Sequence, residues 1–183
     1  MRNSATAFAF LICAGFVTTV IAMQWYPAAL MRASSRESGR AHIIWEFQIR
    51  RVMNSALTYY KNALKNASST LQVTEEMRND AYAKSRETLI ENTIVHDAII
   101  TRGLETETDM LVTKKIAEYS AEPDFNMAVS LVYGLDNSGF VKLIARPEAE
   151  REILKEKNAW DDTALAEWIS KEKNTSRIVK FFK

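Results

Sequence analysis

The sequence TLIENTIVHDAIITRGL, at Thr88–Leu104, predicts the helix around which the rest of the chain packs. Its apolar residues are too widely distributed for one narrow helical stripe; they are Leu89, Ile90, Ile94, Val95, Ala98, Ile99 and Ile100. A helix that is apolar on most of its circumference is a buried helix. Gly103 suits the position just after such a helix, because glycine adopts a positive φ without steric cost. We therefore expect this stretch to form the core.

Further helices are expected on both sides of the core stretch. Upstream, apolar residues recur at three- and four-residue steps and predict a helix from about Ala41 to Ala67. Thr74 is a suitable N-cap for the helix that continues into the core stretch. Downstream, helices are expected to begin near Thr106, Phe125, Asp136 or Asn137, Glu148, and Asp161 or Asp162.

The last part of the chain contains a helix breaker and a candidate strand. Pro147 is expected to kink or break the helical pattern around it, because proline lacks a backbone N–H. Ser176–Phe182 alternates loosely and predicts a short strand, for which the sequence identifies no partner. The predicted fold class is all-α, with a multi-helix domain and a possible C-terminal strand.

Composition excludes several classes of protein. The length of 183 residues allows one modest domain plus a tether, and five Gly and three Pro are too few for a sandwich or barrel. The single Cys excludes an internal disulfide, and no Cys/His pair has zinc spacing. A net charge of +1 provides no basic field for nucleic acid. No P-loop, GxGxxG, HExxH or GxSxG motif occurs, so we expect neither catalysis nor a cofactor.

The N-terminal segment predicts an association with a membrane. Ala5–Met23 carries no charge and is followed by Trp25 and Tyr26, and roughly 20 apolar residues span a bilayer, with aromatic rings favoured at its interface. The segment is either a transmembrane anchor or a cleavable signal peptide. We favour the anchor, because a signal peptide has a shorter apolar core of about 7–15 residues. The expected organisation is an anchor or signal peptide at 1–26, a linker at 27–40 and a helical domain at 41–183.

Three motifs in sequence order carry a family resemblance. They are the LIEN-type core helix, RGLETETDMLVTKKI, and FNMAVSLVYGLDNSGFVKLIARPEAEREIL. Over Thr88–Leu154, with a looser fit upstream to Ala41, the chain resembles the N-terminal chaperone domain of SurA-type and PrsA-type foldases. The resemblance implies a helical domain outside the cytoplasm that binds unfolded or extended polypeptide.

The chain also departs from that family. These foldases usually carry a parvulin-type prolyl isomerase domain, which needs on the order of a hundred residues, whereas only Lys155–Lys183 follows the matched region. Parvulin sites also use histidines, and this chain has only His42 and His96. We interpret His96 as a satisfied core or boundary histidine. Prolyl isomerase activity is therefore expected to be absent.

The resemblance leads to a binding hypothesis with stated alternatives. Methionine and aromatic side chains suit an adaptable apolar groove, and the candidate groove walls are Met110, Phe125, Met127, Val132, Tyr133 and Phe140. The alternative for each residue is that it fills the core. At the level of function, the chain could instead be a structural or assembly subunit of a membrane complex, with the Ala41–Ala67 helix as its partner interface, or an extracytoplasmic sensor module.

The flanking charges conflict with the location that the family implies. Arg32, Arg36 and Arg40 follow the apolar segment, whereas Arg2 precedes it. The positive-inside rule therefore favours a cytoplasmic domain. We follow the resemblance, because the arginine bias is small and is partly balanced by Glu37 and the amino terminus.

Overall fold

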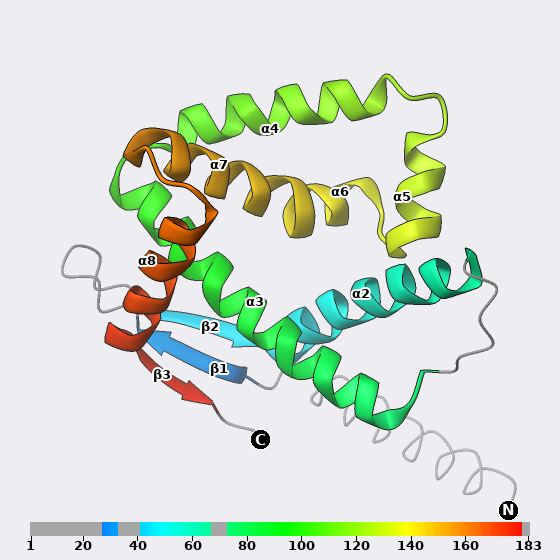
Figure 1. The fold of residues 1–183 in the computed structure, drawn as a ribbon, viewed down its shortest axis with the longest axis horizontal. Helices are drawn as coiled ribbons and strands as arrows, with labels where there is room; N and C mark the ends of the chain where they lie inside the picture. The colour runs from blue at the N-terminus through cyan, green and yellow to red at the C-terminus, as the bar shows by residue number, and fades with distance from the viewer. Residues whose placement is uncertain (1–26, 33–40, 67–72, 181–183) are drawn as a thin grey trace, which may run out of the picture.

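The computed structural model describes residues 27–32, 41–66 and 73–180, and these form a largely helical molecule (Figure 1). The elements, in chain order, are β1 (Pro27–Arg32), β2 (Ala41–Trp45), α2 (Glu46–Asn66), α3 (Glu75–Thr101), α4 (Glu105–Ser120), α5 (Phe125–Tyr133), α6 (Asn137–Phe140), the π-helical turn η1 (Val141–Ala145), α7 (Arg146–Asn158), α8 (Asp162–Thr175) and β3 (Arg177–Lys180).

Helix α3 is the central element, as the sequence predicts. It packs against α2, α7, α8 and β2, and Ile90, Val95 and Ile99 on it are almost fully buried. Thr74 caps its start, where the hydroxyl oxygen accepts a hydrogen bond from Met77 N at 3.2 Å. Gly103 has a φ of 66° just after its end. The local signals for the start and the end of this helix are therefore both confirmed.

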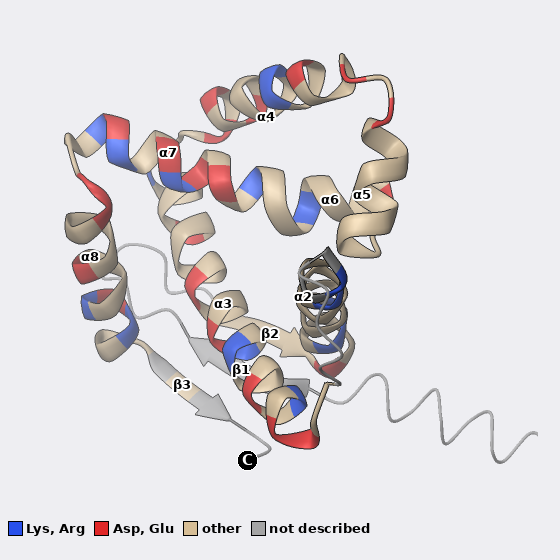
Figure 2. Cartoon of the chain, turned by 45° about the vertical axis from the view of Figure 1, so that its right-hand side comes forward, with Lys and Arg blue, Asp and Glu red and all other residues tan. Residues whose placement is uncertain are grey.

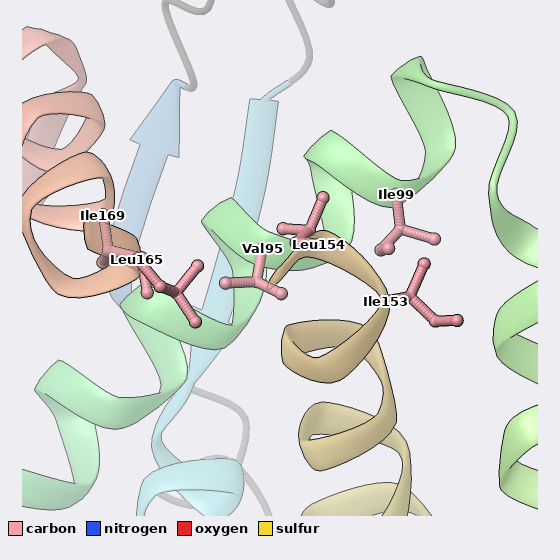
Figure 3. Close-up of a cluster of buried hydrophobic side chains, with 6 residues drawn as sticks. All are labelled: Val95, Ile99, Ile153, Leu154, Leu165 and Ile169. Carbon is pink, nitrogen blue, oxygen red and sulfur yellow. The ribbon is translucent and has the colours of Figure 1, made fainter. Parts of the chain in front are cut away.

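Buried apolar side chains form three clusters along this framework. The first lies between the sheet, α2 and α3, and contains Ile44, Ile49, Ile90 and Ile94. The second joins α3, α7 and α8, and contains Val95, Ile99, Ile153, Leu154, Leu165 and Ile169 (Figure 3). The third lies at the other end of the molecule, among α4, α5, α6 and η1, and contains Val129, Leu135, Phe140 and Ala145.

The mostly helical structure supports the all-α prediction, to which a small sheet is added. The sheet is antiparallel with strand order β2-β1-β3, and its register pairs Leu30 with both Ile43 and Val179. Strand β1 lies inside residues 27–40, which were predicted as a linker. Strand β2 occupies the start of the helix predicted from Ala41, so that α2 begins only at Glu46. The predicted C-terminal strand is present as β3, and its partner is β1.

Of the kink or break expected at Pro147, the break does not occur, and a π-helical turn lies directly before the proline instead. Helix α6, η1 and α7 follow one another without a gap, and Pro147 lies in the first turn of α7. The π-helical turn that precedes Pro147 has a wider hydrogen-bond spacing than an α-helix. This spacing accommodates a residue that has no N–H and whose ring would clash with a carbonyl one turn earlier in a regular α-helix.

The predicted membrane segment, Ala5–Met23, lies outside the described residues. Among the helices at 46–66 and 75–175, none is both long enough and apolar enough to cross a membrane.

Candidate polypeptide-binding surface

The six predicted groove residues do not share one surface. Phe140 is buried, with 6% of its surface exposed, and belongs to the third core cluster. Phe125 and Tyr133 are partly buried against the same cluster. By contrast, Met110 and Met127 are 68% and 55% exposed. Phe140 therefore fills the core, whereas Phe125 and Tyr133 pack against the core and stay partly exposed.

Aromatic rings fill the third cluster and connect four elements. The Phe140 ring centroid lies between 5.5 and 6.0 Å from three other ring centroids, those of Phe125, Tyr133 and Tyr119. Tyr59 on α2 stacks on Tyr133 at 5.7 Å. Edge-to-face and offset contacts at these separations are favourable because of the ring quadrupoles. These rings join α4, α5 and α6 to α2.

Helix α5 carries the exposed apolar face. Met127 and Leu131 are four residues apart, so they lie on the same side of the helix, and Leu131 is 64% exposed. The helix contains no charged residue and is drawn in tan in Figure 2. We call the pair Met127 and Leu131 the α5 face. Leu131 was missed from the sequence, although its four-residue spacing from Met127 was available as a signal.

The other two predicted residues lie apart from the α5 face or beneath it. Met110 is in the second turn of α4, near α3, whereas α5 follows the far end of α4 (Figure 1). Val132 is partly buried next to Leu131. The α5 face therefore contains one of the six predicted residues and adds one that was not predicted.

Helix α2 fixes the C-terminal end of α5. The Asn62 side-chain amide donates to the carbonyl oxygen of Leu131 at 2.5 Å. Gly134 follows α5 with a φ of 63°, and a Cβ atom at this position would lie 3.3 Å from the Thr58 hydroxyl. Glycine therefore allows both the left-handed conformation and the close approach of α2. As a result, the contacts with α2 fix the position of α5 and therefore of the α5 face.

A cavity next to this junction does not include the predicted groove residues. Its volume is about 370 Å³, and it lies between α2 and the turn after α5. Its lining combines polar side chains, such as Arg51, Asn54 and Thr58, with the apolar Phe47 and Leu135, and none of the six predicted residues lines it. Arg51 Nη2 lies 3.0 Å from the Asp136 carboxylate, in an exposed ion pair.

The two histidines pair with carboxylates and lie away from the α5 face. His42 Nε2 is 2.9 Å from both carboxylate oxygens of Asp97, and His96 Nδ1 is 2.7 Å from Glu150. The contact to Glu150 and the partial exposure of the ring agree with the interpretation of His96 as a satisfied boundary residue. The same hydrogen bond raises the pKa of His96. Within the described ranges, no group of three or more His, Cys, Asp and Glu residues could hold a metal ion.

One further titratable group is perturbed near the sheet. Burial, together with a hydrogen bond from its hydroxyl to the Glu46 carboxylate at 2.5 Å, raises the pKa of Tyr82 to about 12. Glu46 also accepts from Arg50 Nε at 2.8 Å. These contacts join α2 to α3, so we assign them a structural role.

Comparisons with known proteins provide no assignment: no family model matches the chain, and no match is found among the curated proteins or the solved structures.

Proposed function

We propose that this chain is a membrane-anchored, extracytoplasmic chaperone-like module that holds unfolded or extended polypeptide and catalyses no reaction. The observation that carries the proposal is the exposed α5 face, where Met127 and Leu131 present apolar side chains on an uncharged helix. Large exposed apolar residues that share one helix face are typical of interaction sites. The resemblance to SurA-type and PrsA-type chaperone domains supports the same proposal.

The chemistry of the α5 face suits weak and unselective binding. Full burial of one such side chain contributes about 1.5–3 kcal/mol, so two side chains provide only modest affinity after the cost of ordering the client. Methionine is flexible and adapts to different apolar partners. Modest affinity together with an adaptable side chain allows rapid capture and release of many sequences, whereas a fixed complex requires a larger interface.

The membrane part of the proposal rests on the sequence. Ala5–Met23 has the length and composition of a membrane span, and Trp25 and Tyr26 follow it at the expected interface. In this proposal the anchor keeps the binding domain close to clients that emerge at the membrane surface. The extracytoplasmic location follows from the family resemblance.

A structural or assembly subunit is the second candidate, and exposed side chains on α2 favour it. Tyr59 is 52% exposed and Tyr60 is 38% exposed on this long helix. Tyrosine is enriched at protein interfaces, because it combines a large apolar ring with a polar end. An assembly subunit would form a complex of fixed stoichiometry, whereas a holdase would bind many clients weakly.

Aggregation of a chemically unfolded model protein, followed by light scattering, tests the proposal. We expect the full chain, kept in a neutral detergent, to slow aggregation relative to a detergent-only control. A prolyl-peptide isomerase assay on the same sample is expected to give only the background rate. If aggregation is unchanged and a stoichiometric partner co-purifies from membranes, the assembly-subunit candidate replaces the holdase. Isomerase activity would contradict the family-based reasoning.

A further inference from the structure

A second cavity lies at the junction of α3, α7 and α8, away from the α5 face. Its volume is about 340 Å³, within the range of small-molecule sites. Leu165 and Ile169 form an apolar part of its wall, and both also belong to the core cluster beneath (Figure 3). Arg151 from α7 and Lys173 from α8 add positive charge to the same cavity.

Arg151 is a partly buried cation without a carboxylate partner. Its Nη1 atom donates to Asn92 Oδ1 at 2.7 Å and lies 3.5 Å from the carbonyl oxygen of Pro147. Among the described residues, no carboxylate lies within ion-pair distance of the guanidinium, and neither Nε nor Nη2 has a hydrogen-bond partner. Burial lowers the pKa of Arg151, against the attraction of the Glu91 and Glu150 carboxylates, which lie beyond ion-pair distance of the guanidinium. A desolvated cation is costly unless an anion compensates it.

The acidic residues around Arg151 are engaged with other cations. Glu150 contacts His96 at 2.7 Å, and Asp162 contacts Lys155 at 2.8 Å. Glu91 lies 3.8 Å from Lys173, whose nearer partner is Glu87 at 2.6 Å. Glu91 and Glu150 still attract Arg151, but neither these two carboxylates nor Asp162 contacts its guanidinium, whose Nε and Nη2 atoms therefore remain available for a ligand.

We propose that the α3–α7–α8 cavity binds a carboxylate that carries a branched apolar group, such as the C-terminal residue of a peptide or a small branched acid. The free edge of the Arg151 guanidinium forms the charged end of the site, because a planar guanidinium matches a carboxylate with two parallel hydrogen bonds. Leu165 and Ile169 contact the apolar group. Glu91 and Asp162 in the lining repel any anion, but they repel a doubly charged phosphate more strongly than a singly charged carboxylate.

The proposal is tested by titrating the full chain, in a neutral detergent, with N-acetyl-leucine, and following the amide resonances of Ala166 and Ser170 by NMR. N-acetyl-leucinamide has the same apolar group without the charge and is expected to bind at least about tenfold more weakly. Inorganic phosphate is expected to bind more weakly than N-acetyl-leucine. Titration with 4-methylpentanoate distinguishes a simple acid from a peptide end: equal binding indicates the former, weaker binding the latter, and both support a carboxylate site.

Two variants separate binding from folding. Arg151→Gln removes the charge and is expected to weaken binding at least about tenfold, whereas Arg146→Gln, on the same helix but paired with Asp109, is the matched control and leaves binding unchanged. Ala166→Phe fills the cavity from an exposed position, so it blocks binding without disturbing the core. Unchanged binding in Ala166→Phe or in folded Arg151→Gln overturns the proposal. Equal binding of acid and amide, or tighter binding of phosphate, also overturns it.

Discussion

His96 Nδ1 lies 2.7 Å from Glu150 Oε1, and this contact joins α3 to α7. Glu150 is almost fully buried, whereas the His96 side chain is 43% exposed. The next residue on α3, Asp97, contacts His42 on β2. Two consecutive residues of the central helix therefore connect it to α7 on one side and to the sheet on the other.

The His96–Glu150 contact predicts a pH-dependent contribution to stability. The pKa of His96 is raised in the folded chain, chiefly by the hydrogen bond to Glu150 and against the effect of burial. The contribution is therefore fully present below the ordinary histidine pKa of about 6.5 and is lost as the pH rises through the raised value. Because the ring is partly exposed, we expect only about 1 kcal/mol.

Urea denaturation of the wild-type chain and of His96→Gln, at several pH values between about 5.5 and 8.5, measures this contribution. The unfolding free energy of the wild type is expected to exceed that of His96→Gln most at the acidic end of this range, and the difference is expected to shrink toward the basic end. Two pH profiles that stay parallel over this range would show that His96 does not titrate differently in the folded state.

Truncation of Phe140 and of the α5 face should have very different effects on stability. Phe140→Ala is expected to lower the unfolding free energy by about 3–5 kcal/mol, because it empties the centre of the aromatic cluster. Met127→Ala and Leu131→Ala should change it by about 0.5 kcal/mol or less, since both side chains are exposed. Thermal or urea unfolding followed by circular dichroism makes the comparison. A large loss for Leu131→Ala would mean that this residue belongs to the core.

Gly134 and Gly103 provide a matched test of the α2–α5 junction. Both have positive φ, at 63° and 66°, so alanine at either position should cost about 1–2 kcal/mol of stability from backbone strain. At Gly134 a Cβ atom would also lie 3.3 Å from Thr58, whereas at Gly103 no atom lies within 4 Å. We therefore expect Gly134→Ala to be more destabilising than Gly103→Ala when both are measured by urea unfolding. Equal losses of unfolding free energy in the two variants would mean that α2 shifts to accommodate the added Cβ atom at no measurable cost.

The helical part of the fold was predictable because its signals are local. The apolar circumference of the core stretch, the Thr74 cap and the glycine after α3 each involve residues close in sequence, and all three are confirmed. One local signal failed: α4 begins at Glu105 rather than after a Thr106 cap, and the Thr108 hydroxyl bonds instead to the Leu104 carbonyl oxygen. The error moves the boundary by one or two residues, the usual uncertainty at helix ends.

The sheet was not predictable from local pattern. Strand β1 pairs with β3 from the opposite end of the chain, and short strands gain stability only from such partners. The helix was predicted to begin at about Ala41, although its apolar stripe begins at Ile49, and the residues before Glu46 form β2 instead. Pairing between distant segments, rather than residue type, determines whether β1, β2 and β3 form strands.

Residue type alone also could not separate core from surface on α5. Methionine and aromatic residues suit a binding groove and a core equally well. The structure separates them by helix face: Val129 and Tyr133 face the aromatic cluster, whereas Met127 and Leu131 face outward. The orientation of α5 is set by tertiary contacts such as Asn62 with the Leu131 carbonyl, which the sequence does not reveal.

The most direct test of the proposed function compares holdase activity before and after the α5 face is made polar. We predict that the folded double variant Met127→Ser/Leu131→Ser will need at least about tenfold more protein for half-maximal suppression of aggregation, because two apolar contacts are lost. Met110→Ser, which changes an equally exposed methionine on α4, should suppress aggregation as well as the wild type. Full activity in the double variant would contradict the assignment of the α5 face as the client-binding surface.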